Sequence, residues 1–264
     1  MASLLFARVG AVVGSAVLLV GCGGGEESAA GSAQSSGPSV AESTSAPARD
    51  TTAACSARIR LNAKIPPGAD PGEPDPAPQA MKDWAASVSP DFEILAANLP
   101  ADLAPQVDTQ RADLEKARRG ERIDGISPAT MKSSNAIDEF VFDKCGLPQL
   151  DVISTEGKYG PIPATLNAGP TAIRFAATGA DSRAACVLLV ARVRDGQTVS
   201  LQDLTAEKVE LESIAEVTAA VLPDHGQPGY ATADLKTGHY ILETPLGVLP
   251  DCSGGVTEAE FTVP

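Results

Sequence analysis

The chain is poor in aromatic residues and in the side chains that most often carry out catalysis. Aromatic residues make up 4% of its 264 residues, and the histidines are only His225 and His239. No serine lies in a Gly-x-Ser-x-Gly sequence, which argues against a hydrolase of the Ser-His-Asp type. No P-loop sequence occurs, so no phosphate cradle is indicated. From these absences we expect a protein that is not an enzyme.

Basic residues are also scarce. The chain has 20 Lys and Arg against 34 Asp and Glu, a formal net charge of −14. Such a surface repels nucleic acid and anionic lipid headgroups, so neither is an expected partner. No two cysteines form a Cys-x-x-Cys pair, which argues against a zinc knuckle or a thioredoxin-type centre. No cofactor or metal is therefore expected.

Two groups of carboxylates could attract a cation weakly. Glu258 and Glu260 lie two residues apart and would share one face of a strand, and the other group is a Pro/Gly-rich acidic loop that contains Asp70, Glu73 and Asp75. We interpret both groups as solvated surface.

The amino terminus has no apolar run long enough to cross a bilayer. Residues 9–21 are a mostly apolar run of thirteen after Arg8, which suits the core of a signal peptide. The sequence Leu19-Val20-Gly21-Cys22 resembles a bacterial lipobox. That resemblance implies lipid transfer to the Cys22 thiol, cleavage before Cys22 and acylation of the new amino terminus, for example with palmitate. We expect residues 1–21 to be a lipoprotein signal peptide, and the mature protein to be anchored to the extracytoplasmic face of the cell membrane.

Residues 22–52 contain the lipidated Cys22 and a tether. Gly, Ser and Ala dominate the segment, and it has no aromatic residue. It cannot bury enough apolar surface to offset the entropy of ordering, so we expect it to be disordered. About thirty such residues reach roughly 30 Å.

The other cysteines are Cys55, Cys145, Cys186 and Cys252. In an oxidising compartment an even number indicates two disulfides, for which three pairings exist. We favour Cys55–Cys145 and Cys186–Cys252, because each pair then lies inside one expected domain. In the chain-entropy model their loops (145−55 = 90 and 252−186 = 66 residues) are each worth roughly 4–5 kcal/mol.

Residues 53–148 show helical periodicity, and we expect a small helical bundle there. Pro90 should end the second helix, because a proline removes a helical hydrogen bond. Ser127-Pro128 is typical of a helix start, and Gly120 and Gly146 of helix ends. Five helices are expected: residues 55–65, a helix with Met81, Trp84 and Val88, a short one with Phe92, Leu95 and Leu99, one with Leu103, Val107, Leu114 and Ala117, and one with Ile137, Phe140 and Val141.

Residues 149–264 change to a strand pattern. Residues 171–177 alternate apolar and other side chains, which predicts a half-buried strand, and the apolar run 186–191 predicts a central one. Residues 230–235 and 239–243 flank a turn and predict a hairpin, residues 260–263 a last strand, and residues 201–214 a helical interruption. The whole chain is therefore expected to be α+β with two domains, the second an antiparallel β-sandwich.

The turns and strands of this second domain resemble those of cupredoxin-like domains in secreted bacterial proteins. The sequences that carry the resemblance are Tyr159-Gly160-Pro161-Ile162-Pro163, Asn167-Ala168-Gly169-Pro170, Gly229-Tyr230-Ala231 and Thr237-Gly238-His239-Tyr240. The resemblance implies a cupredoxin-like fold over about residues 151–264. The helical segment, ending in residues 138–146, resembles the amino-terminal half of actinobacterial lipoproteins, a likeness that implies no activity.

The copper sites of the cupredoxin family use two histidines, a cysteine and usually a methionine. Laid onto this sequence, the histidine positions fall near Cys186 and Cys252, the cysteine near Thr244 and the methionine near Thr257. None carries the family's ligand, so the resemblance implies a domain that has lost its copper site. Cysteines at both histidine positions would be placed to bond to each other, and a structural disulfide would then replace the metal. A redox-active disulfide and a two-thiolate metal site stay open as alternatives.

Together these features favour a non-enzymatic binding or scaffolding module of the cell envelope. Its partner would be another envelope protein or a small ligand, with membrane contact through the acyl chains on Cys22. The alternative is a metal-handling (copper or iron) or redox protein that uses carboxylates or the Cys186/Cys252 pair. A lipid or glycolipid carrier is a third hypothesis, and it would need a large apolar cavity.

Overall fold

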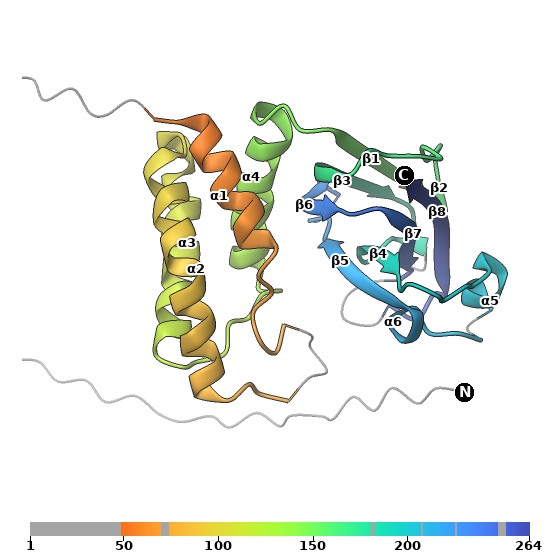
Figure 1. Ribbon diagram of the computed structural model, residues 1–264, viewed down its shortest axis with the longest axis horizontal. Helices are drawn as coiled ribbons and strands as arrows, with labels where there is room; N and C mark the ends of the chain where they lie inside the picture. Colours follow the sequence, from red (N-terminus) through yellow and green to blue (C-terminus); the bar gives the residue numbers. More distant parts are fainter. Residues whose placement is uncertain (1–48, 70–73, 181–182, 207, 225, 248–251) are drawn as a thin grey trace, which may run out of the picture. The chain divides into compact units, whose positions relative to one another are not determined.

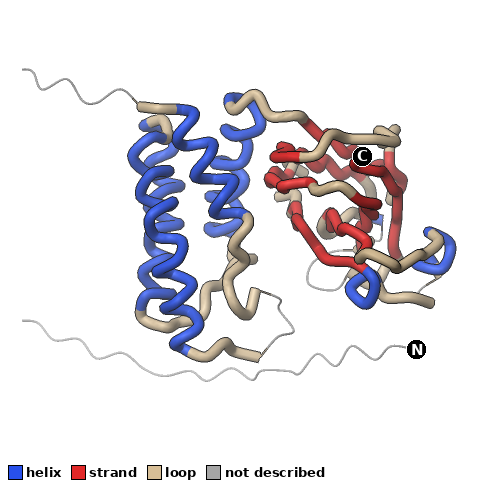
Figure 2. The backbone as a smooth tube through the Cα atoms, in the orientation of Figure 1, coloured by secondary structure: helices blue, strands red, loops and turns tan. Residues whose placement is uncertain are grey.

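The structure, a computed structural model, describes residues 49–69, 74–180, 183–206, 208–224, 226–247 and 252–264. Helices precede two β-sheets in an α+β fold (Figures 1 and 2). The described residues belong to one compact unit, Pro47–Pro264. The change from helix to strand falls at the expected boundary between residues 148 and 149. A division into two domains stays a prediction. Cys22, the signal peptide and most of the tether lie outside the described residues.

Four long helices form the bundle: α1 (Thr51–Asn62), α2 (Pro78–Asn98), α3 (Ala104–Arg118) and α4 (Pro128–Lys144). The Asp50 carboxylate caps α1 by accepting from the Thr52 and Ala53 amides, and the Ser127 hydroxyl caps α4 by accepting from the Thr130 amide. The predicted start at Ser127-Pro128 is confirmed. None of the described helices is long and apolar enough to span a membrane.

The prediction that Pro90 ends a helix is wrong, because α2 continues through it. A proline inside a helix costs about 3 kcal/mol, and packing outweighs that cost here. Val88 and Phe92, on either side of Pro90, are 3% and 4% exposed and belong to the same apolar core. Next to the proline, Asp91 accepts hydrogen bonds from Arg60 and Lys64, which hold this part of α2 against α1.

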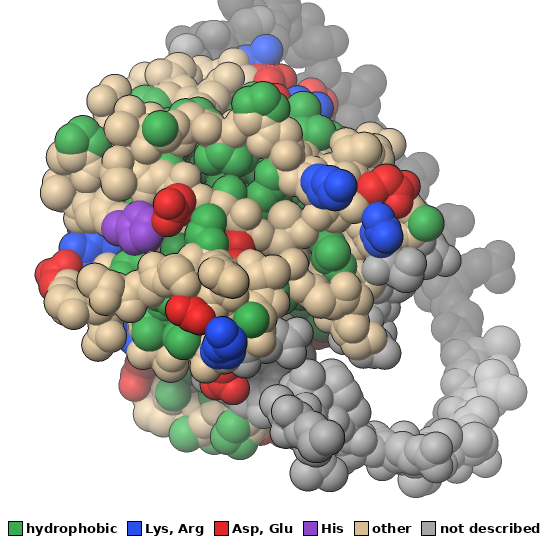
Figure 3. Space-filling view, turned by 90° about the vertical axis from the view of Figure 1, so that its right-hand side faces the viewer, with side chains coloured by type: hydrophobic (Ala, Val, Ile, Leu, Met, Phe, Trp, Pro, Cys, Tyr) green, Lys and Arg blue, Asp and Glu red, His purple; other side chains and the backbone are tan. Residues whose placement is uncertain are grey.

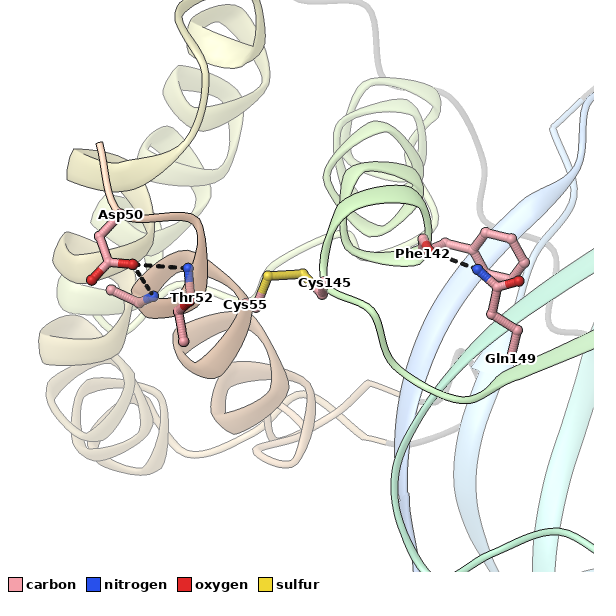
Figure 4. The surroundings of a disulfide bond; sticks show 7 residues. Asp50, Thr52, Cys55, Phe142, Cys145 and Gln149 are labelled. Carbon is pink, nitrogen blue, oxygen red and sulfur yellow. Dashed lines mark hydrogen bonds between the residues drawn. A yellow bond between two sulfur atoms is a disulfide. The ribbon is translucent and has the colours of Figure 1, made fainter. Parts of the chain in front are cut away.

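The bundle is held by a disulfide and a buried ion pair. Cys55 of α1 bonds to Cys145, the residue that ends α4, with a Cα–Cα distance of 5.8 Å (Figure 4). One turn along α1, the Arg58 guanidinium donates to both carboxylate oxygens of Asp138, at 2.8 and 2.5 Å. The predicted bond between the first and last helices is therefore confirmed.

Two four-stranded sheets make up the β part. One sheet has the order β2 (Lys158–Tyr159), β1 (Gln149–Thr155), β3 (Gly169–Thr178) and β6 (Gly229–Leu235), and the other has β5 (Ala215–Val221), β4 (Leu188–Val193), β7 (Gly238–Pro245) and β8 (Val256–Val263). Their inner faces share one apolar core, which includes Phe175, Val190 and Phe261. The predicted sandwich and its central strand, β4, are confirmed. Two short helices, α5 (Leu201–Thr205) and α6 (Leu211–Ile214), occupy the predicted helical interruption.

The sandwich is not purely antiparallel, because β1 and β3 run parallel. Parallel neighbours need a crossover connection. After β2 the chain runs across to the edge of the other sheet, where the amide of Leu166 donates to the Thr262 carbonyl of β8 and the Thr262 amide donates to the Ala164 carbonyl. It then returns to β3, so β3 enters its sheet in the same direction as β1.

The predicted hairpin between β6 and β7 is also wrong. The two strands lie in different sheets, β6 beside β3 and β7 between β4 and β8. The Tyr240 hydroxyl accepts from the Lys236 amide and donates to the Lys236 carbonyl, which fixes the corner between them. The chain folds over the shared core at this corner because Leu235 and Tyr240 both face inward.

The bundle covers the outer face of the sheet that contains β3 and β6. Ala172, expected on the solvated face of its strand, is fully buried. The Asn135 side chain of α4 accepts from the Tyr230 amide and donates to the Leu222 carbonyl, and the Phe142 ring meets the Tyr230 ring edge-on at 5.7 Å. This cover explains why β3 is buried on both faces along part of its length.

Candidate functional site

The four positions to which the predicted resemblance assigns copper ligands come together at one end of the sandwich. Thr244 of β7 lies directly opposite Thr257 of β8. The Cys186 amide donates to the Pro245 carbonyl at 3.0 Å, and Cys186 is bonded to Cys252 with a Cα–Cα distance of 6.2 Å. The predicted Cys186–Cys252 pairing is therefore confirmed.

Tyr159 of β2 also contacts this cluster. Its ring packs against the core of the sandwich, and its hydroxyl donates to Thr244 Oγ1 at 2.6 Å. Burial, with the negative charges of Glu243 and Glu258 nearby, raises the pKa of the Tyr159 hydroxyl, and the bond to Thr244 offsets only part of that rise. A tyrosine held protonated in this way donates one hydrogen bond and does not act as a base.

Two carboxylates of the outer face adjoin the same end. Glu243 of β7 and Glu258 of β8 are direct cross-strand partners. Thr205 of α5 donates to one oxygen of Glu258, and the other oxygen is buried without a hydrogen-bond partner among the described residues. Burial raises the pKa of Glu258 above its usual range. Burial, reinforced by Glu212 and Glu258, raises the pKa of Glu243 to about 7.

A wide-mouthed hollow of about 520 Å³ lies beside these groups. Its walls come from β2, α5 and β8 and include Tyr159, Thr205, Thr257 and Glu258. Figure 3 shows acidic and basic side chains interspersed with apolar ones on the face turned toward the viewer. Among the described residues, no group of three or more His, Cys, Asp or Glu side chains is arranged to hold a metal ion.

Replacing Glu243 with glutamine is expected to stabilise the protein at pH 8 but not at pH 4. The pKa of Glu243 is about 7 in the folded state against 4.5 when exposed. Folding therefore favours the protonated form, so the contribution of this group to stability falls as pH rises from about 4.5 to 7. Glutamine cannot ionise, so the variant should gain of the order of 1 kcal/mol at pH 8, a value that allows for solvent screening of this half-buried group.

The measurement is urea unfolding of both proteins at pH 4 and pH 8. Glu216→Gln is the matched control, because Glu216 is an exposed carboxylate on β5 of the same sheet. A gain for Glu243→Gln that is equal at the two pH values would show that the carboxylate does not titrate as described.

The remaining candidate residues lie apart from this end or outside the described chain. His239 Nε2 lies 3.0 Å from Glu260 Oε2 on the outer face of the β7–β8 pair. Asp75 pairs with Arg122 at 3.0 Å. Asp70, Glu73 and His225 lie outside the described residues.

The chain matches no protein-family model, and no curated protein matches it. The resemblance to cupredoxin-like domains therefore stays a prediction, and the description of the fold goes no further than an α+β protein with a β-sandwich.

Sequence reasoning missed Glu243 and Thr205 as members of this site. Glu258 was named only as a surface carboxylate with Glu260, whereas its partners are Glu243 and Thr205. The antiparallel pairing of the last two strands could have been expected from their order along the chain. Their register sets Glu243 opposite Glu258, and it depends on the length of the connecting loop, which no sequence pattern fixes.

Proposed function

We propose that this protein is a lipid-anchored component of the cell envelope and acts as a non-enzymatic binding or scaffolding module. Its sandwich would be a degenerate cupredoxin-like domain without a copper site. One observation supports this most: the Cys186–Cys252 disulfide and the Tyr159–Thr244 hydrogen bond occupy the positions where the resemblance places copper ligands.

A structural role suits the Cys186–Cys252 disulfide better than a redox role. Cys186 is 3% exposed, and disulfide exchange needs a thiolate to reach a sulfur atom. The bond fastens the chain before β4 to the segment before β8. In this proposal it takes over the clamping that a metal ion provides in copper-binding relatives.

The anchor in this proposal depends on Cys22 and on the apolar run before it. Acyl chains on Cys22 would hold the protein to the membrane on its extracytoplasmic side, and the Gly/Ser/Ala-rich tether would let the folded part stand clear of the lipid. The acidic chain agrees with this arrangement, because it gives the surface no general attraction to anionic headgroups.

Full-length protein purified from bacterial membranes is expected to carry acyl chains on Cys22 and to contain no free thiol. Mass spectrometry of the amino-terminal peptide gives the first result, and thiol titration in denaturant without reductant gives the second. Cys22→Ser should leave the protein unacylated. A wild-type protein that carries no acyl chain and is not found in the membrane would contradict the anchor. Two free thiols at Cys186 and Cys252 would contradict the role of that disulfide as a clamp.

Metal handling is a second candidate, which the Glu243–Glu258 pair favours. The carboxylates of Glu243 and Glu258 are adjacent, and one oxygen of Glu258 has no hydrogen-bond partner among the described residues. Such a pair could bind a copper or iron ion that the protein passes to or takes from another envelope component. Metal analysis of the purified protein separates the two candidates. One bound copper or iron per chain that is lost in Glu243→Gln would support metal handling, and a folded protein free of both would support the binding module.

A further inference from the structure

The four-helix bundle contains a second cavity, half-open and of about 290 Å³, which is lined by residues between 58 and 134. All four helices and two loops line it, which is where helical bundles commonly hold ligands. Its apolar side includes Trp84, Val88 and Phe92, and its polar side includes Gln110, Thr130 and Ser134.

The apolar side of this bundle cavity is closely packed. Val88, Phe92 and Leu114 are each less than 5% exposed and belong to the bundle core. The Trp84 indole N–H donates to the Lys64 carbonyl at 2.9 Å, which fixes the plane of the ring. A preformed apolar wall of this kind binds a ligand without a large cost in ordering side chains.

The charges around the bundle cavity are already balanced. Arg58 is paired with Asp138, Asp113 with Lys116 at 2.7 Å, and Lys64 with Asp91 at 3.1 Å. An ionised ligand would therefore enter without a free counter-ion, at the cost of removing its charge from water.

Uncharged hydrogen-bonding groups complete the polar side. Gln110 Nε2 donates to Ser134 Oγ at 3.2 Å, which is long for a hydrogen bond. The Thr130 hydroxyl donates to Asp113 Oδ2 at 2.7 Å. A hydroxyl or amide on a ligand could accept from or donate to Gln110 and Ser134 in place of their weak mutual bond.

We propose that the bundle cavity binds a small uncharged molecule with an aromatic or aliphatic body and one hydrogen-bonding group. The body would lie against Trp84 and Phe92, and the polar group would face Gln110 and Ser134. A volume of about 290 Å³ is at the lower limit for ligand pockets, about 300 Å³, and so excludes a whole diacyl lipid. The inference rests on the proposed binding role but not on the lipid anchor.

The test uses N-phenyl-1-naphthylamine, an uncharged fluorescent probe, with the full-length protein. Trp84 is the only tryptophan of the chain, and it lines the cavity, so energy transfer from its indole reports a probe bound there. The expected result is saturable quenching of Trp84 with sensitised probe emission. 1-Anilinonaphthalene-8-sulfonate has the same rings and an added sulfonate, and its affinity should be at least tenfold weaker.

Gly125→Phe should weaken binding of the neutral probe at least tenfold, and Gly125→Ala should leave it within twofold. Gly125 lines the cavity and a Cβ there meets nothing within 4 Å, so the alanine is accommodated, and the larger phenylalanine ring is expected to narrow the mouth of the cavity. Ile65→Asp is a second variant. Ile65 is 64% exposed, so this variant should fold, and its new charge at the rim should weaken binding. Ile153→Asp, at a 49% exposed residue of β1, is its control.

The proposal is overturned if the neutral probe gives no saturable Trp84 quenching, if the sulfonate binds as tightly, or if Ile65→Asp and Ile153→Asp bind the probe equally well. None of these outcomes depends on the acylation of Cys22 or on the metal content of the protein. Failure of this proposal is therefore distinguishable from failure of the envelope function.

Discussion

Asp138→Ala is expected to lower the free energy of unfolding by about 3–5 kcal/mol. The guanidinium of Arg58 is 7% exposed, and Asp138, which is 3% exposed, accepts two of its N–H groups. Removing the carboxylate leaves a buried positive charge without its partner. The loss also frees the Asn62 amide, which donates to Asp138 at 3.1 Å and to Thr232 of β6 at 2.7 Å.

Urea unfolding followed by circular dichroism measures this loss, and the double variant Arg58→Met/Asp138→Leu is the control. It removes both charges and keeps much of the volume, so it should cost far less than Asp138→Ala alone. If the single and double variants lose equal stability, the effect comes from the lost hydrogen bonds between Arg58 and Asp138 and not from an unpaired charge.

Replacing Cys55 and Cys145 together with alanine is expected to cost about 2–5 kcal/mol of unfolding free energy. The bond closes a loop of 90 residues, so its main effect in the chain-entropy model is to restrict the unfolded chain. The helices themselves should persist in the folded variant. Their apolar core includes Met81, Leu95 and Ile137, which are fully buried, and it contains neither cysteine.

Thermal and urea unfolding without reductant measure the effect of this bond. Cys186→Ala/Cys252→Ala is the matched comparison, because its loop is shorter, at 66 residues. Reductant should destabilise the wild type more than either double variant. A Cys55→Ala/Cys145→Ala protein as stable as the oxidised wild type would contradict a stabilising role for the bond.

The sequence predicted local features of the fold better than long-range ones. The start of α4 follows from the Ser127 hydroxyl, which accepts from the Thr130 amide, and the end of α3 from Gly120, whose positive φ lets its own amide donate to the Ala117 carbonyl. Pro90 was misjudged because its cost is local, whereas the packing of Val88 and Phe92 that outweighs it involves other helices. The turn at Lys236 was misjudged for the same reason, because a tight turn can join two sheets as well as two paired strands.

The candidate site was predicted only in its covalent part. The pairing of Cys186 with Cys252 followed from an even cysteine count, from the expectation that each bond lies inside one domain, and from the positions in the resembling family. Thr205 reaches Glu258 across 53 residues, and Tyr159 reaches Thr244 across 85. Contacts of this kind depend on how the sheets close around the core, and hydrophobic periodicity carries no information about that closure.

The bond between Cys55 and Cys145 also decides how the molecule would bear mechanical tension. The two Cα atoms lie 5.8 Å apart, although 90 positions separate them along the chain. A pull between the beginning of α1 and the start of β1 would pass from one sulfur to the other and bypass the polypeptide of α2, α3 and α4. Those three helices would carry no load, so such a pull could not unravel them while the bond is intact.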